Sequence, residues 1–189
     1  MLILVKSLYK IALSKIIFSK PKKAKTVVWG VPLYSKKILN QKKFNLKKIE
    51  FIEIWGKSYN FHILLRCFLR LKFSLLDYSN EYISYVKPKI ILTFLDNYKT
   101  FYKIKKSPEQ RKIIIQNSWR CDEFNFFKKD KEYNSHVVDY IFVQNINIKK
   151  KYHEISSAKV MATGSFLSNT IRIKNARKKI DVLYISTFR

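Results

Sequence analysis

Two pairs of polar side chains stand where apolar runs of the sequence end. Asp96 and Asn97 follow the run KIILTFL, and Gln116 and Asn117 follow the run KIII. A carboxylate can act as a general base, and amide side chains can hydrogen-bond a polar ligand. Ligands of open parallel sheets bind just outside the carboxyl ends of the strands, so we place the working face of the protein there.

Short apolar runs alternate with helical patterns along most of the chain. Strands are expected at residues 26–31, 49–55, 89–95, 112–115, 139–143, 158–162 and 181–186. Helices are expected at residues 34–39, 61–71, 75–86, 97–105 and 148–155. Continuous apolar runs of this length, separated by helices, are typical of buried parallel strands. The sequence therefore predicts an α/β fold: a Rossmann-like parallel sheet with flanking helices.

The charge of the chain is strongly positive. Its 189 residues carry 39 Lys+Arg against 13 Asp+Glu, a formal net charge of +26. Such a charge favours phosphate groups, nucleic acid or an acidic membrane face, although a Lys-rich overall composition explains it equally well. Arg is scarce and no DNA- or RNA-reading motif is present, so nucleic acid is not the expected partner. With three Gly residues, the chain also lacks a P-loop and a dinucleotide fingerprint.

Neither the cysteines nor the histidines form a recognisable metal motif. Cys67 and Cys121 are far apart, and the three histidines are isolated from one another in the sequence. We therefore expect buried thiols in a reducing compartment and no metal site. The expected location is the cytoplasm.

The first twenty residues have the pattern of a basic amphipathic helix. Leu4, Leu8 and Ile11 share one helical face, and lysines interrupt the apolar residues. The run is too broken to span a bilayer, but such a helix can lie among lipid headgroups at the inner face of the membrane. Packing against its own domain is the alternative. The expected organisation is this helix at 1–20, a Rossmann-like domain at 26–170, and a basic linker with one strand of a second domain at 171–189.

Five strings together resemble a family of bacterial surface carbohydrate biosynthesis proteins that are similar to GT-B glycosyltransferases. They are KPKIILTFLDNYKTFYKIK, KIIIQNSWR, VDYIFVQN, ATGSFLSN and VLYIST, in that order. The resemblance covers the chain from about Thr26 onward, and it departs from the family pattern at Ser118, where Gly is common. It implies the N-terminal half of a GT-B fold, which usually binds the acceptor, with the active site in a cleft between two domains.

The resemblance also implies what this chain lacks. The donor half, which holds most contacts to the nucleotide diphosphate, is not covered, so the chain is expected to be an incomplete enzyme, a fragment or a subunit that needs a partner. No cofactor is expected in this chain, and a nucleotide-sugar donor is expected for a full-length enzyme. The expected partner is a glycan or lipid-linked acceptor.

Glycosyl transfer needs a base for the acceptor hydroxyl. Asp96 is the best candidate because a carboxylate follows a strand there, although capping of the helix at 97–105 would explain it equally well. His136 is a weaker candidate.

The remaining candidates would bind substrate. The amides of Asn97, Gln116 and Asn117 suit sugar hydroxyls, or else brace loops. Arg120 suits a phosphate or an acidic sugar, or else is a surface charge. The backbone N–H groups of Thr163, Gly164 and Ser165 could meet an anion, or else form a plain turn. Two rival functions stay open: a non-catalytic subunit that binds a glycan precursor or an anionic membrane, and, less favoured, a nucleic-acid-binding module.

Overall fold

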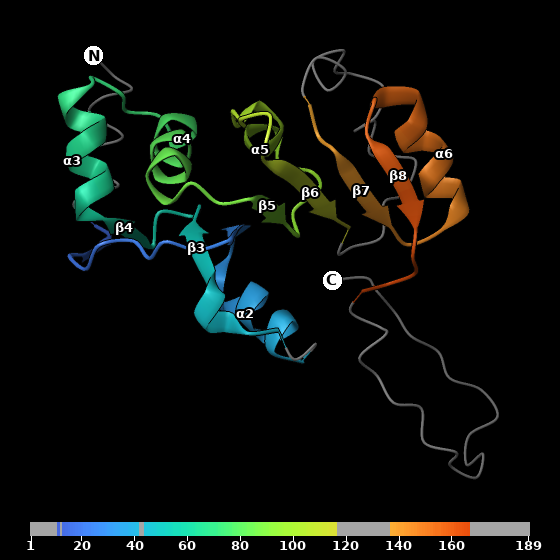
Figure 1. Cartoon of the computed structure of the whole chain (residues 1–189), viewed down its shortest axis with the longest axis horizontal. Coiled ribbons are helices and arrows are strands. Elements are labelled where there is room, and N and C mark those ends of the chain that lie inside the picture. Colours follow the sequence, from blue (N-terminus) through green and yellow to red (C-terminus); the bar gives the residue numbers. More distant parts are fainter. Residues whose placement is uncertain (1–10, 12, 42–43, 117–136, 167–189) are drawn as a thin grey trace, which may run out of the picture.

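The computed structural model describes residues 11, 13–41, 44–116 and 137–166, which form an α/β domain (Figure 1). Its main sheet has six strands in the order β3-β2-β5-β6-β7-β8, and every pair of neighbours is parallel. The strands are β2 (Thr26–Gly30), β3 (Ile49–Glu53), β5 (Ile90–Thr93), β6 (Arg111–Ile115), β7 (Tyr140–Val143) and β8 (Lys159–Ala162). The prediction of a parallel, Rossmann-like sheet is confirmed.

Helices cover both faces of this sheet. On one face, α2 (Pro32–Gln41) packs Ile38 and Leu39 against a cluster that includes Leu92. The other face carries the larger core, to which Ile91 belongs, because neighbouring residues of a strand point to opposite faces. Its helices are α3 (Phe61–Leu69), α4 (Leu75–Val86), α5 (Lys99–Lys103) and α6 (Ile146–Ile155), and a 3-10 turn, η1 (Leu46–Lys48), precedes β3.

The bounds of α4 follow from local signals. Ser74 and Asp77 form a capping box at its start, in which each side chain meets the backbone N–H of the other residue. The helix ends at Val86, its C-cap Lys87 has a left-handed backbone (φ 54°), and Pro88 follows. Tyr78 and Tyr82, one helical turn apart, are buried in the core, so this side of the helix is a packing surface.

A second, two-stranded sheet corrects the expected N-terminal helix. Residues Lys15–Ile17 form strand β1, which pairs in parallel with β4 (Ser58–Asn60). The prediction of a helix over 1–20 is therefore wrong for residues 15–17, and residues 1–10 lie outside the described residues. The pattern missed β1 because its pairing partner lies about forty residues away, and Asn60 reinforces the pairing by donating from Nδ2 to the Ser19 carbonyl (2.7 Å).

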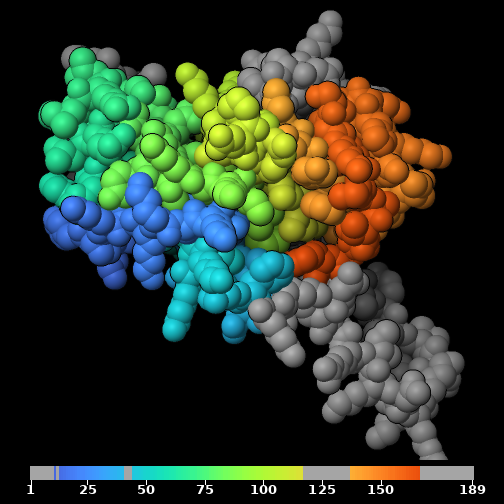
Figure 2. Space-filling model, viewed as in Figure 1, coloured from blue at the N-terminus to red at the C-terminus, as the bar shows by residue number. Residues whose placement is uncertain are grey.

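Different helices lie at the two ends of the molecule. Figure 2 shows the α3 and α4 region at one end of the molecule and α6 with β8 at the other. The expected strand at 181–186 and the linker before it lie outside the described residues.

Candidate functional site

The strand order reverses between β2 and β5. The chain leaves β2 through α2 toward β3 on one side, and later returns to place β5, β6, β7 and β8 on the other. In parallel sheets such a reversal leaves a crevice at the carboxyl ends of the two strands. Thr93 joins these ends, because its hydroxyl donates to the Trp29 carbonyl (2.8 Å) and accepts from the Leu95 N–H (3.0 Å).

Asp96 lies in the turn after β5, and its side chain is fully buried. Its carboxylate accepts a hydrogen bond from the Tyr152 hydroxyl of α6 (2.9 Å), and its carbonyl accepts one from the Tyr102 hydroxyl (2.8 Å). The N-cap of α5 is Tyr98, so the helix-capping interpretation of Asp96 is wrong. The carboxylate is thus held within the core at the edge where we expected a base.

Gln116 follows β6 directly and is also buried, with 1 % of its surface exposed. Its Oε1 accepts a hydrogen bond from the backbone N–H of Gln144, which follows β7 (3.0 Å). Its Nε2 is buried and has no hydrogen-bond partner within the described ranges. A buried N–H group without an acceptor carries a desolvation penalty of about 1–3 kcal/mol, which a ligand oxygen would relieve. Within the described residues, this amide is the buried donor at the edge that lacks an acceptor.

The turn after β8 lies at the same edge. Thr163 extends the ladder by donating its N–H to the Val143 carbonyl (2.9 Å), which occupies the N–H group that we expected to meet an anion. Gly164 has a left-handed backbone (φ 82°). Both residues are exposed and Ser165 is half-buried. The aromatic ring of Phe166, the residue after Ser165, packs on the ring of Phe94, which follows β5 (centroids 5.7 Å apart). This turn therefore runs back toward the centre of the sheet.

The other candidates divide into two groups. Asn97 is exposed in the turn after β5, where it is accessible to a ligand. Asn117, Arg120 and His136 lie outside the described residues. The structure therefore brings Asp96 and Gln116 to the ends of adjacent strands, as the sequence predicted.

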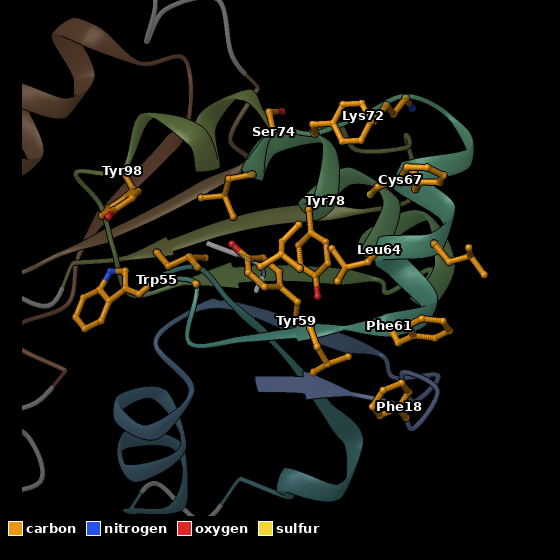
Figure 3. A pocket seen from close by; sticks show the side chains of 18 residues that line it. Phe18, Trp55, Tyr59, Phe61, Leu64, Cys67, Lys72, Ser74, Tyr78 and Tyr98 are labelled. Carbon is orange, nitrogen blue, oxygen red and sulfur yellow. The ribbon is translucent and has the colours of Figure 1, made fainter. Parts of the chain in front are cut away.

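A cavity of about 900 Å³ lies beside this edge, between α3, α4 and the end of β3 (Figure 3). Trp55 and Gly56 line it after β3, and Tyr98 lines it two residues after Asp96. Among the described residues, Lys72 is the only charged side chain in its wall. The cavity is thus an apolar space that adjoins the polar edge.

Burial makes two polar groups of this cavity, the Cys67 thiol and the Tyr78 hydroxyl, weaker acids. Desolvation raises the pKa of the Cys67 thiol to about 11 and raises the pKa of the Tyr78 hydroxyl well above its usual value. Figure 3 shows both side chains among those that line the space. A protonated, buried thiol is a poor nucleophile, so this cavity is suited to binding an apolar group and not to covalent chemistry.

Sequence reasoning missed the contacts that join distant segments. Tyr152 stands one helical turn after Ile148 on the buried face of α6, and that spacing predicts burial but not its Asp96 partner. The cavity is lined from β1, β4, α3, α4 and the segment that follows β3, and no local pattern indicates it. No group of three or more His, Cys, Asp or Glu side chains that could hold a metal ion is found in the part of the chain that the structure describes.

Residues 113–189 match the model of a protein family described as "putative O-antigen biosynthesis protein". The match starts within β6 and includes Gln116 and the turn after β8. No curated protein and no solved structure matches the chain. None of the helices that the structure describes is long and apolar enough to cross a membrane. Over these residues the chain is similar to proteins of O-antigen biosynthesis.

Proposed function

We propose that this chain forms the acceptor-binding domain of a glycosyltransferase that builds a bacterial surface polysaccharide. The observation that carries the proposal is the buried Nε2 group of Gln116, which lacks a partner among the described residues and stands at the carboxyl end of a central strand. This residue also lies within the segment that is similar to the O-antigen family. A sugar hydroxyl is the kind of acceptor that such an amide needs.

In the proposed reaction, an acceptor hydroxyl attacks the anomeric carbon of a nucleotide-sugar. The new bond joins that oxygen to the sugar, the bond from the sugar to the diphosphate breaks, and the nucleotide diphosphate leaves. Asp96 takes the hydroxyl proton as general base. Because Asp96 is fully buried, this role requires the turn after β5 to move when the acceptor binds. Asn97, Asn117 and Arg120, with the turn at Thr163, Gly164 and Ser165, would complete the acceptor site.

The adjoining cavity suits the apolar part of a lipid-linked acceptor. Tyr98 lines the cavity and follows Asp96 by two residues, so a ligand could place its sugar at the edge and its lipid in the cavity. A volume of about 900 Å³ falls within the usual range of small-ligand sites. A subunit that binds the glycan precursor without catalysis would use the same two regions.

To test this role, the gene is disrupted in its native cell, and the disrupted strain is complemented with the native gene or with variants. We expect loss of the surface polysaccharide on disruption, rescue by the native chain, and failure of rescue by Gln116→Leu and Asp96→Asn although both variants accumulate. Rescue by Asp96→Asn with failure of Gln116→Leu would indicate the non-catalytic binding subunit. An unchanged polysaccharide after disruption would refute the proposed role.

A further inference from the structure

Exposed apolar side chains gather at one end of the described chain. The described residues include thirteen large hydrophobic side chains that are exposed, and eight of these lie within residues 13–18 and 61–71. Six of them make up what we call the α3 surface: Phe18, Phe61, Leu65, Phe68, Leu69 and Leu71. Four of these, Phe18, Phe61, Leu65 and Phe68, also line the mouth of the cavity described above, so the surface and the cavity adjoin. Apolar patches of this kind on a protein surface mark interaction sites.

The fold holds this surface rigidly. Four of its residues lie on α3 with the spacing i, i+4, i+7 and i+8, which places them on one helical face. The opposite face is anchored by Ile63 and Cys67 in the core, and Asn60 caps the helix by accepting from the N–H groups of its first turn. The Phe18 ring lies against that of Phe61 (centroids 5.3 Å apart), as Figure 3 shows.

Leu71 gives a second indication that the surface has a function. It has a left-handed backbone (φ 52°) just after α3, a position where Gly or Asn is usual because a Cβ is unfavourable there. Its side chain is 78 % exposed, so packing within the domain does not explain a leucine. Neither the backbone conformation nor burial within the domain explains a leucine at position 71. Contact with a partner outside the domain would explain it.

The charges around the surface are positive. Residues 54–76 contain Lys57, Arg66, Arg70 and Lys72 with no acidic residue, and Lys15 lies in β1, which pairs with β4 directly before α3. Glu81 of α4 contacts Arg66, Arg70 and Lys72, with N···O distances of 3.4, 2.8 and 3.1 Å. One buried carboxylate against three partly exposed cations leaves the rim cationic.

We propose that the α3 surface docks on an anionic phospholipid bilayer. Its leucine and phenylalanine side chains would enter the boundary between headgroups and acyl chains, and the cationic rim would meet the lipid phosphates. The sequence led us to expect that the first twenty residues contact the bilayer, and this proposal gives that contact to α3 together with Phe18. This inference does not rest on the proposed enzymatic role.

Charge argues for a bilayer over a second copy of the chain. In a two-fold dimer through this surface, each cationic rim would face its own copy, and like charges would repel. An anionic bilayer neutralises the same charges and covers the same apolar side chains.

The experiment is cosedimentation of the full chain with vesicles of phosphatidylglycerol and phosphatidylcholine, and with phosphatidylcholine alone. A charge of +26 attracts any anionic surface, so each assay is repeated at about 0.5 M salt, where screening isolates the apolar contribution. The Phe68→Ser/Leu69→Ser variant should bind anionic vesicles at least about tenfold more weakly in both salts. The control is Leu33→Ser on α2, which removes a leucine that is more exposed (81 %) than Leu69 (74 %) and should bind as the native chain does.

Leu71→Gly separates docking from folding. Removing the Cβ at a left-handed position should leave the melting temperature unchanged or raise it, while vesicle binding weakens. Equal binding by the native chain and the Phe68→Ser/Leu69→Ser variant would overturn the proposal. So would an equal loss in Leu33→Ser, or a dimer in solution that this double variant abolishes.

Discussion

The Tyr152 hydroxyl donates a hydrogen bond to the Asp96 carboxylate across 56 residues of sequence, and both side chains are fully buried. The bond links α6, which follows β7, to the turn after β5, and so it spans the central strands of the sheet. The candidate base therefore also contributes to the core.

Tyr152→Phe should destabilise the domain by about 1–3 kcal/mol, because it removes a donor from a buried carboxylate. Urea denaturation followed by circular dichroism measures this loss. In Asp96→Asn the charge is already absent, so adding Tyr152→Phe should cost less than it does in the native chain. Equal losses in the two backgrounds would show that the bond contributes no coupling energy.

Gln116 and Gln110 bracket β6 and give a matched pair of buried amides. Gln110 Nε2 donates to the Pro88 carbonyl (2.9 Å) and its Oε1 accepts from the Ser107 N–H (2.8 Å), whereas Gln116 Nε2 has no partner in the described segments. Gln110→Leu should lose about 1–3 kcal/mol of stability and keep acceptor binding. Gln116→Leu should lose less stability, because it also removes an unsatisfied donor, and should lose acceptor binding.

Saturation-transfer NMR with oligosaccharides of the native surface polysaccharide measures the binding of both variants. Full binding by Gln116→Leu would remove this amide from the acceptor site.

Lys112 should give the domain an unusual alkaline stabilisation. Its Nζ is buried and donates to the Tyr102 and Ile104 carbonyls (2.7 and 2.9 Å). Burial, and then the charge of Lys106, lowers the pKa of Lys112 from 10.5 to about 7, and Asp139 opposes this shift. The unfolded chain therefore binds more protons between these two values, and stability rises with pH.

From pH 7 to 9 the rise attributable to Lys112 should be on the order of 2 kcal/mol, at 1.36 kcal/mol for each pKa unit. Urea denaturation at both pH values measures it, and subtracting the same difference for Lys112→Met removes the contributions of other groups. A similar rise in both proteins would contradict the assignment.

Glu81→Gln should destabilise the packing of α3 on α4 by about 1–3 kcal/mol, because Arg66, Arg70 and Lys72 lose their carboxylate. The loss of stability is moderate because these cations are partly exposed and water can solvate them in the variant. Burial alone would raise the pKa of Glu81, but hydrogen bonds and charge from Lys72 and Arg70 lower it overall.

This stabilisation should be present above the ordinary pKa of 4.5 and be lost as the pH falls further, so acid unfolding of Glu81→Gln should lack this component. Glu109→Gln, at an exposed position, is the control and should change stability little. Identical acid transitions for the native chain and Glu81→Gln would contradict the role of this cluster.

Elements that depend on residues close together in the sequence were predicted accurately, and elements that depend on distant residues were not. The helix expected at 75–86 has those bounds in the structure, because its capping box and Pro88 act within a few residues. The strand expected at 89–95 ends at Thr93, since pairing with β2 stops there and the chain turns toward Asp96. Strands β1 and β4 were missed because each has three residues and exists through the other.

For the candidate site too, local features were predicted and contacts between distant segments were not. Placing Asp96 and Gln116 at one edge needed only the alternation of strands and helices. The burial of Asp96, the unpaired amide of Gln116 and the apolar cavity depend on which helices pack above the edge, and α6 comes from about fifty residues further on.

The all-parallel sheet has a consequence for synthesis on the ribosome. Parallel neighbours cannot be joined by a tight hairpin, and β2 must wait for β5, whose Thr93 meets Trp29 across 64 residues. Until residues 90–93 have left the ribosome, the apolar strand Thr26–Gly30 cannot pair with β5, and the core on either side of it is not yet formed. The nascent chain therefore passes through a stage in which it is prone to aggregation, and chaperones that shield apolar segments would act on it then.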